Sequence, residues 1–398
     1  MRLKRVFGWI ALAIPLVAIL AVAVGYWLSD NDCGNAAAPG VPMKAIVYCD
    51  YGTADVLRFE DVEKPVPGDD ELLVRVHAAG VNPLDWHYMR GTPYLMRLSS
   101  GLRKPQDTRL GVDYAGTVEA VGRNVTRFKP DDQVFGGRSG ALAQYVVAKQ
   151  DGAVALKPAN VSFEQAGAVA IAATTALQGL RDAGRLQTGD KVLINGASGG
   201  VGTFAVQIAK SMGAEVTAVC STRNVELVRS LGADHVVDYT RDDYTSVDAR
   251  YDVILDNVGN RSLAENRRVL ESDGRYVLIG GGGPEAGKWI GPMVKPVQAL
   301  VTSPFVSQDL GMFLAILTRE DMQRLAELMS SGAVTPVIDR DYFWAIYFRT
   351  PGGVLFEVAT NEPGFDRDED TAHLGEALKL PAQHAHLRAA LEKYLEPI

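Results

Sequence analysis

The pattern of apolar and polar positions divides the chain into stretches of different character. Residues 7–29 contain no charged side chain, and a helix of that length, at about 1.5 Å per residue, can cross a bilayer core of roughly 30 Å. Trp9 lies near one end of this run, and Tyr26 and Trp27 lie near the other, where an aromatic belt is expected. The pattern predicts a single-pass membrane protein, with residues 1–42 as anchor and linker.

A cleaved signal peptide is the alternative for this segment. The apolar region of such a peptide usually spans only about 7–15 residues and ends at small residues. The run here is longer, and residues 29–33 (Ser-Asp-Asn-Asp-Cys) do not resemble a cleavage site, so we favour an uncleaved anchor. Arg2, Lys4 and Arg5 precede the run, which by the positive-inside rule places the N-terminus in the cytoplasm and the rest of the chain outside.

Residues 43–165 have the pattern of a β-rich domain. Apolar and polar positions alternate over short runs that Gly and Pro bound, and no long helical period is present. The strands expected here are 44–48, 71–77 and 114–121.

Strands and helices alternate farther along the chain. The strands expected are 191–195, 215–220, 235–238, 251–256 and 275–279, and the helices between them include 201–212, 224–231 and 262–270. Such alternation predicts a parallel, doubly wound sheet and therefore the α/β class. We assign this unit to residues 166–304 and expect residues 305–340 to return to the β-rich domain.

Composition narrows the classes of function. The 398 residues suggest two or three domains, and 47% hydrophobic with 22% charged residues fits a globular chain. The net charge of −8 argues against a nucleic-acid partner, because phosphate binding needs a basic face. Cys33, Cys49 and Cys220 show no close spacing, so neither a disulfide framework nor a cysteine-built zinc site is expected.

A glycine-rich loop lies between the first strand of the alternating unit and its helix. Residues 196–202 read Gly-Ala-Ser-Gly-Gly-Val-Gly and keep a G-x-x-G-x-x-G spacing. Glycine permits a tight turn, the approach of a pyrophosphate to the backbone and close helix–strand packing, and the positive end of the helix faces the phosphates. Because the motif sits at a strand–helix junction within repeated units, it predicts dinucleotide binding rather than an ordinary glycine turn.

The end of the second strand indicates which dinucleotide is bound. NAD enzymes usually place an acid there for the ribose hydroxyls, whereas this chain has Ser221, Thr222 and Arg223. These side chains could hold a 2′-phosphate through charge-assisted hydrogen bonds, so we expect NADPH; a solvated residue at a helix start is the alternative for Arg223. A cytoplasmic cofactor conflicts with an enzyme outside the membrane, so the side of the membrane is left open.

Several motifs, in the expected order, resemble the medium-chain dehydrogenase/reductase superfamily. They are residues 80–85 (Gly-Val-Asn-Pro-Leu-Asp), 111–118 (Gly-Val-Asp-Tyr-Ala-Gly-Thr-Val), 195–202 and 231–236 (Leu-Gly-Ala-Asp-His-Val). The resemblance covers roughly residues 43–340. It implies a GroES-like catalytic domain that is split in sequence around a Rossmann domain, with the active site between the two.

The zinc-dependent branch of that superfamily carries a cysteine ligand where this chain has Asn82, and a His-Glu pair where it has Val112 and Asp113. The resemblance is therefore to the zinc-free, quinone-oxidoreductase-like branch, and no metal is expected. Without a Lewis acid an alcohol has no obvious means of lowering its hydroxyl pKa, whereas an electrophilic quinone or enone needs less help. We expect hydride transfer to a quinone or a related enone or carbonyl acceptor, with a proton following from a side chain or water.

The resemblance also indicates site residues. Asn82 would act as an amide donor to the acceptor oxygen, and Tyr88 as a second donor or proton source; a turn-former before Pro83 and a packed aromatic are the respective alternatives. The residues expected to bind the cofactor are Thr174, Thr175, Gly196, Ser198, Gly199, Gly200, Val201, Gly202, Ser221, Thr222, Arg223, Asn257, Gly259, Gly280 and Gly281.

Residues 341–398 depart from the reductase pattern. Residues 347–365 resemble the end of a vicinal oxygen chelate protein of the glyoxalase or ring-cleaving dioxygenase type, in which the residue matching Glu357 is a metal ligand. The other ligands of that site are absent, so we expect no metal here. We interpret residues 334–340 as a junction between two genes, and leave open whether residues 353–360 replace the closing strand of the catalytic domain.

Other functions stay open at this point. They are a zinc-free alcohol or enal reductase, a metal-dependent dioxygenase-like fusion with an inactive tail, and a non-catalytic NADPH-binding protein. The expected partners are a small-molecule substrate, the membrane and, as a further candidate, a second copy of the chain. In relatives the apolar run 297–305 forms a dimer contact or lines the substrate cleft.

Overall fold

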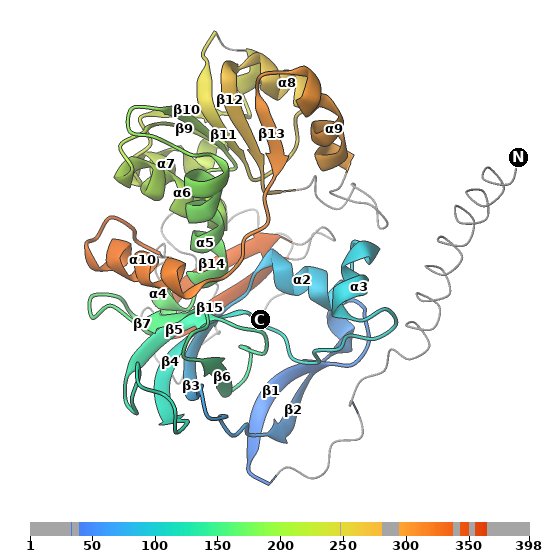
Figure 1. Cartoon of the computed structure of the whole chain (residues 1–398), viewed down its shortest axis with the longest axis vertical. Helices are drawn as coiled ribbons and strands as arrows, with labels where there is room; N and C mark the ends of the chain where they lie inside the picture. The colour runs from blue at the N-terminus through green and yellow to red at the C-terminus, as the bar shows by residue number, and fades with distance from the viewer. Residues whose placement is uncertain are drawn as a thin grey trace, which may run out of the picture.

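The structure is a computed structural model that describes residue 33, residues 40–246, 248–280 and 294–336, and the backbone of 343–349 and 355–363. Two sheets dominate it, one antiparallel and one parallel. Figure 1 shows the two sheets at opposite ends of the described part of the chain, with α5 (Ala170–Gln178) and α10 (Arg319–Ser330) between them.

The antiparallel sheet has five strands in the order β6-β3-β4-β5-β7. Its buried core includes Leu72 and Val74 of β3 packed with Tyr114 and Val118 of β4. The β-rich character expected for this part of the chain is confirmed. The strands are β3 (Glu71–Gly80), β4 (Asp113–Val121), β5 (Gln133–Gly137), β6 (Tyr145–Lys149) and β7 (Val154–Leu156), and β1 (Pro42–Tyr48) pairs with β2 (Leu57–Glu63) in a separate hairpin.

Short helices connect the strands in the antiparallel part of the chain. The helix α2 begins directly after β3, because Pro83 fixes a helical φ at its first position. It ends at Gly91, which adopts the left-handed conformation with φ of 58°. The helices here are α2 (Pro83–Arg90), α3 (Arg97–Ser100) and α4 (Phe163–Ala166), with 3-10 turns at Ala54–Val56 and Tyr94–Met96.

The parallel sheet has six strands in the order β10-β9-β8-β11-β12-β13. Helices cover both faces: α5 and α6 share one buried cluster with the sheet, and α8 and α9 share another. The doubly wound, parallel sheet is thereby confirmed. Its strands are β8 (Lys191–Asn195), β9 (Glu215–Cys220), β10 (His235–Asp238), β11 (Tyr251–Asp256), β12 (Leu270–Leu278) and β13 (Asp309–Met312). Its helices are α6 (Gly200–Ser211), α7 (Val225–Ser230), α8 (Leu263–Arg268) and α9 (Val294–Thr302), with a π-helical turn at Gly179–Ala183 and 3-10 turns at Tyr244–Ser246 and Ser303–Phe305.

After β13 the chain returns toward the antiparallel sheet through α10. Thr318 caps this helix by accepting the N–H of Asp321 at 3.1 Å. The buried Asp321 carboxylate accepts hydrogen bonds from Gln178 of α5 at 2.5 Å and from Arg181 at 2.6 Å. A buried carboxylate with charged and neutral donors is held firmly, so this cluster fastens α10 to α5. The exact domain boundaries given above stay predictions.

The expected membrane location is wrong for the part of the chain that the structure describes. Within these residues, no helix is both long and apolar enough to cross a bilayer. The segment 7–29, from which that location was inferred, lies outside the described residues.

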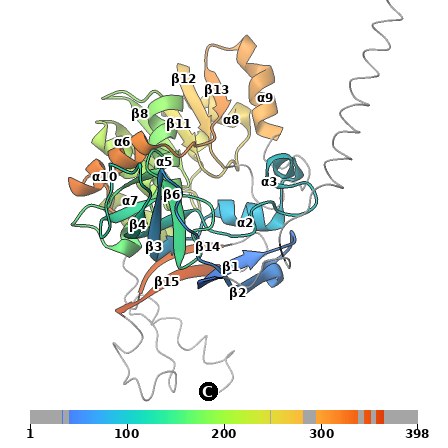
Figure 2. The same ribbon diagram turned by 60° about the horizontal axis from the view of Figure 1, so that its bottom comes forward.

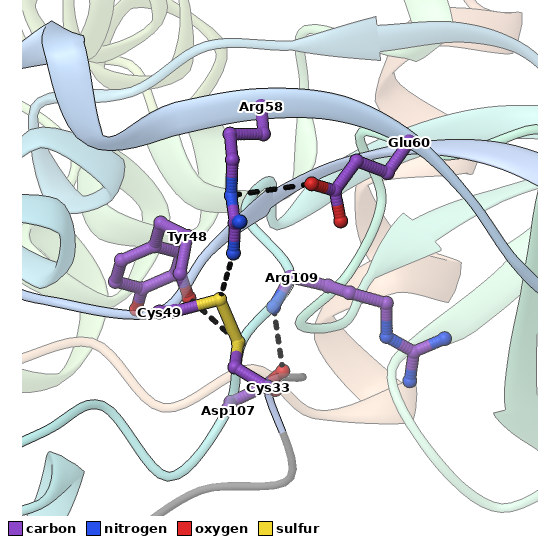
Figure 3. The surroundings of a disulfide bond; sticks show 7 residues. All are labelled: Cys33, Tyr48, Cys49, Arg58, Glu60, Asp107 and Arg109. Carbon is purple, nitrogen blue, oxygen red and sulfur yellow. Dashed lines mark hydrogen bonds and ion pairs between the residues drawn. A yellow bond between two sulfur atoms is a disulfide. The ribbon is translucent and has the colours of Figure 1, made fainter. Parts of the chain in front are cut away.

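The expectation that the cysteines form no disulfide is also wrong. Cys33 and Cys49 are bonded, with their Cα atoms 5.6 Å apart and 16 positions apart in sequence. The sequence spacing resembles no motif, but β1 carries the chain to a point beside Cys33, and the Cα separation is within the range that a disulfide can bridge. Figure 3 shows the bond with the Arg58 guanidinium donating to Cys49 Sγ.

Removing this disulfide is expected to destabilise the protein. A cross-link that closes a loop of this size lowers the entropy of the unfolded chain by an amount worth about 3 kcal/mol. We expect the double variant Cys33→Ser, Cys49→Ser to show a lower free energy of unfolding in denaturant titrations. A reducing agent should destabilise the wild type by a similar amount and leave the double variant unchanged; equal stability of oxidised and reduced wild type would contradict this assignment.

The last described strands belong to neither large sheet. Figure 2 shows β14 (Phe343–Arg349) and β15 (Leu355–Pro363) side by side, and they pair with each other in a two-stranded antiparallel sheet. Within that segment the described residues 355–360 therefore pair with β14 and not with the five-stranded sheet. The resemblance of the tail to vicinal oxygen chelate proteins stays a prediction.

Candidate functional site

The glycine-rich loop lies where β8 meets α6. Gly196 follows the strand with φ of 77°, a left-handed conformation that glycine adopts without strain. Gly202, in the first turn of α6, packs directly on the loop: a Cβ there would lie 2.1 Å from the carbonyl oxygen of Gly196. The predicted strand–turn–helix context is confirmed, and Gly202 sets the distance between α6 and β8.

A buried carboxylate organises the neighbouring loop. Asp256, at the end of β11, is 0% exposed. Its Oδ1 accepts hydrogen bonds from Asn195 Nδ2 and from the N–H of Gly259, both at 2.8 Å. Its Oδ2 accepts the Tyr276 hydroxyl at 2.7 Å. Sequence reasoning missed Asn195 and Asp256, although their positions at the carboxyl ends of adjacent parallel strands were a usable signal.

The end of β12 approaches the same loop. A Cβ on Gly280 would lie 1.9 Å from the carbonyl oxygen of Asn257. The side chain of Asn257 donates to the carbonyl of Asn195 at 3.0 Å. Gly196, Asn257, Gly259 and Gly280 are therefore brought to one edge of the sheet. Gly281 lies outside the described residues.

Polar side chains link the loops after β8 and β9. Asn224 donates to Ser198 at 3.0 Å and to Ser221 at 3.2 Å. The Thr222 hydroxyl is engaged differently from our expectation, because it donates to Asp238 at 2.5 Å. Arg223 is exposed, within a 3-10 turn at Thr222–Asn224.

The acid beside Thr222 was missed by sequence reasoning. Asp238 ends β10, and hydrogen bonds from Thr222 and Thr240 lower the pKa of its carboxyl group. The Arg241 guanidinium lies 3.6 Å away and offsets part of its charge. Three side chains were expected to bind a 2′-phosphate. Thr222 is hydrogen-bonded to Asp238, and Ser221 is hydrogen-bonded to Asn224. Arg223 takes part in neither of these contacts.

Asn82 lies at the junction of β3 and α2 and is 7% exposed. Its N–H donates to Asp85 Oδ2 at 2.7 Å. Asp113, the first residue of β4, is 0% exposed, and its Oδ1 accepts the N–H of Ile171 at 2.9 Å. Thr174, one turn farther along α5, is also 0% exposed. Residues far apart in sequence are thus gathered where α2, β4 and α5 meet.

Several buried polar atoms at this junction have no hydrogen-bond partner within the described residues. A buried polar atom without a partner costs about 1–3 kcal/mol, and such atoms in a fold indicate a ligand, a water or a special role. They are Asn82 Nδ2, Asp85 Oδ1, Asp113 Oδ2 and Thr174 Oγ1, and Asn257 Oδ1 in the loop after β11 is another. Thr175 differs, because its hydroxyl donates to the carbonyl of Ile171 at 2.7 Å.

The two carboxyl groups at the junction are shifted toward neutrality. Burial raises the pKa of Asp113 to about 8, and it raises the pKa of Asp85 to about 6. The side chain of Asn82 and the N–H of Ile171 oppose the shift of Asp113, whereas the charge of Asp85 adds to it. A neutral Asp113 at pH 7 is therefore expected.

Tyr88 is placed among other apolar side chains. It packs against the small cluster of Tyr48, Met89 and Leu110. Its neighbour His87 donates from Nδ1 to the carbonyl of Thr92 at 2.6 Å, and burial lowers the pKa of the imidazole. The catalytic role suggested for Tyr88 stays a prediction, and the packed aromatic is its alternative.

The chain is similar to known families and proteins over much of its length. Residues 68–159 match the family of the alcohol dehydrogenase GroES-like domain, and residues 231–345 match a zinc-binding dehydrogenase family. The 2-methylene-furan-3-one reductase of Solanum lycopersicum is 34% identical over 310 residues, which are 75% of this chain and 71% of that protein. The chloroplastic NADPH-dependent alkenal/one oxidoreductase of Arabidopsis thaliana is 32% identical over 323 residues, or 78% and 75% of the two chains.

The fold is similar to that of solved structures. The quinone oxidoreductase of Coxiella burnetii superposes with a TM-score of 0.63 at 27% sequence identity. The match covers 74% of this chain and 89% of that one.

Proposed function

The chain belongs to the medium-chain dehydrogenase/reductase superfamily and is an oxidoreductase, and on that premise we propose that it is a zinc-independent, NADPH-dependent reductase of quinones or enones. The observation that carries this proposal is the buried amide of Asn82, whose Nδ2 has no partner among the described residues. An amide donor at this junction suits an acceptor oxygen that gains negative charge during reduction.

The residues fit a dinucleotide. Gly202 and Gly280 occupy places where a Cβ would meet backbone atoms, so the loops after β8, β11 and β12 lie close together. Thr174 Oγ1 and Asn257 Oδ1 are buried polar atoms with no partner in the described part of the chain. The glycine-rich loop at the start of α6 would hold the pyrophosphate of the dinucleotide. Thr174 and Asn257 would contact the nicotinamide half of the cofactor.

Zinc independence is proposed from the chemistry of the available donors. Catalytic zinc takes three protein ligands from Cys, His, Asp or Glu. At the junction of α2, β4 and α5 the side chains are the neutral amide of Asn82, the apolar Val112 and two acids. One of these, Asp85, already accepts the N–H of Asn82. This set does not fit a zinc site.

The reaction needs a hydride, an oxyanion donor and a proton. Bound NADPH would supply the hydride. Asn82 would donate from Nδ2 to the carbonyl oxygen of the acceptor and stabilise the enolate or quinolate that develops there. A proton from a side chain or from water then completes the reduction.

Turnover tests this proposal directly. We expect the full-length protein to oxidise NADPH with members of a panel of quinones and enones, and to do so equally well with and without a chelator. Failure to reduce any acceptor, or loss of the activity on chelation, would overturn it. Binding is measured separately by the fluorescence of NADPH.

We propose that Arg223 determines the preference for NADPH over NADH. Replacing it with alanine removes the one exposed cation of the turn after β9, and charge-assisted hydrogen bonds are worth roughly 1.5–3 kcal/mol. We expect the KM for NADPH to rise about tenfold or more, and the KM for NADH to change little. Arg229→Ala is the matched control, because Arg229 lies farther along on α7 and pairs with Glu226 at 2.8 Å. Equal effects of Arg223→Ala on both cofactors would refute the assignment.

A second copy of the chain is a proposed partner. Several large apolar side chains on and after α9 are exposed, including Leu300 at 74% and Phe305 at 84%. Exposed apolar side chains that gather into a large patch mark interaction surfaces. The oligomeric state measured by light scattering tests this point.

A further inference from the structure

Asn82 lies between two buried acids that come from different elements. Asp85, in the first turn of α2, accepts the Asn82 N–H and thereby fixes the backbone. Asp113, from β4, lies beside the Asn82 side chain, which lowers the pKa of its carboxyl group. One acid therefore holds the main chain of Asn82, and the other faces its amide.

The hydrogen-bonding capacity of this pair is only partly used. Asp113 Oδ1 accepts the Ile171 N–H. The Asn82 side chain lies close enough to Asp113 to lower its pKa, but neither Asp113 Oδ2 nor Asn82 Nδ2 forms a well-aligned hydrogen bond within the described residues. An ionised Asp113 carboxylate can only accept hydrogen bonds, and it would accept one from the Asn82 amide N–H. Such charge-assisted hydrogen bonds are about twice as strong as neutral ones. A neutral carboxyl group is a weaker acceptor, and with its proton on Oδ2 it presents a donor rather than an acceptor to the amide.

We propose that Asp113 is a positioning residue that acts through Asn82: in its neutral form it leaves the Asn82 amide free to donate to the substrate oxygen, and in its ionised form it withdraws that donor. The inference rests on the proposed function, because it requires an acceptor oxygen at Asn82. Ionisation would also place a buried negative charge next to the oxygen on which negative charge develops. Loss of the Asn82 donor and the added negative charge both oppose reduction of the substrate, so both lower kcat when Asp113 ionises.

The surroundings of Asp113 leave few groups that can control its charge. Its partners in the sheet are Gly80 on β3 and Gly137 on β5, and α5 contributes the backbone of Ile171. Among the described residues, the titratable group that acts on Asp113 is Asp85 of α2, whose negative charge raises the Asp113 pKa. No cation from these elements is paired with Asp113.

The direction of the pH dependence follows from these contacts. The pKa of Asp113 is about 8, so the neutral form predominates below that pH and the carboxylate above it. We expect kcat to fall as pH rises through about 8, by about tenfold per pH unit once the carboxylate predominates. Acceptor affinity for the complex of the enzyme with NADP⁺ should fall over the same range.

Two isosteric variants test the inference. In Asp113→Asn the side chain keeps its shape but cannot ionise, so we expect the alkaline fall in kcat to vanish whatever the absolute kcat of the variant. In Asp85→Asn the neighbouring charge is removed and the Asp113 pKa drops, so the alkaline fall should persist and move to lower pH. A purely structural role for Asp113 would instead lower stability and leave the pH profile unchanged.

Thermal unfolding gives a readout that does not depend on turnover. An acid whose pKa is raised by folding stabilises the native state at low pH, and this contribution is lost as pH rises through the folded pKa. Wild type should therefore lose more stability between pH 6 and pH 9 than Asp113→Asn. If wild type reduces an acceptor but Asp113→Asn retains the alkaline fall in kcat, the inference fails and the proposed function stands. If no acceptor is reduced at any pH, both fail.

Discussion

Replacing Gly202 with alanine is expected to abolish NADPH binding and to destabilise the parallel sheet. The added Cβ would lie 2.1 Å from the carbonyl oxygen of Gly196 and 2.7 Å from two atoms of Ala197. All three are backbone atoms, so no side-chain rotation relieves the overlap, and α6 must move away from β8. Overpacking of this kind costs roughly 1–3 kcal/mol or more. We expect NADPH affinity, measured by fluorescence titration, to fall about 100-fold or more.

Gly200→Ala is the matched control for this prediction. Gly200 lies in the same turn, but the nearest atom to its Cβ would be the Cβ of Ala172 at 3.9 Å, an ordinary contact. We expect this variant to unfold at the wild-type temperature. Any loss of NADPH affinity in Gly200→Ala would then report the approach of the pyrophosphate rather than damage to the fold. Wild-type affinity in Gly202→Ala would contradict the assignment of the loop.

The sequence predicted the parallel sheet well because its central strands β8, β9 and β11 are buried on both faces. The predicted ranges 191–195, 215–220, 235–238 and 251–256 coincide with β8, β9, β10 and β11. Strands of this kind read as short continuous apolar runs between turn residues. The range 275–279 covered only part of β12, which begins at Leu270. Leu270 pairs with Tyr251, and a register shift separates this pair from Arg275 opposite Val253, an irregularity that no local pattern reveals.

The polar framework of the site could be predicted only in part. Asn82 and the glycine loop carry local signals, namely a position before Pro83 and a glycine spacing. Asp113 carries no such signal, and Asp256 offers only its position at the carboxyl end of a parallel strand, because a single acid has the same local pattern whether it is solvated or buried. Their roles depend on contacts across the sheets, to Ile171 and to Asn195 respectively. The Cys33–Cys49 bond was missed because the spacing of the two cysteines in the sequence does not reveal that their Cα atoms lie 5.6 Å apart.

Replacing Asn82 with alanine is expected to lower kcat by about 100- to 1000-fold, the usual effect of removing one oxyanion donor. Asn82 is also the N-cap residue of α2, and loss of a cap costs about 0.5–2 kcal/mol of stability. A fall in activity alone would therefore not separate a catalytic role from a turn-forming role. The expected signature is a loss in kcat with little change in the KM for NADPH.

Asn82→Ser separates the two roles, because serine is a good N-cap residue but lacks the amide. If Asn82 donates to the substrate oxygen, Asn82→Ser should recover the thermal stability of wild type and remain as impaired in kcat as Asn82→Ala. Recovery of kcat together with stability would assign Asn82 to the turn before Pro83 and remove it from the chemistry. The donor to the acceptor oxygen would then have to be sought among other side chains, and Tyr88→Phe would be the first variant to measure.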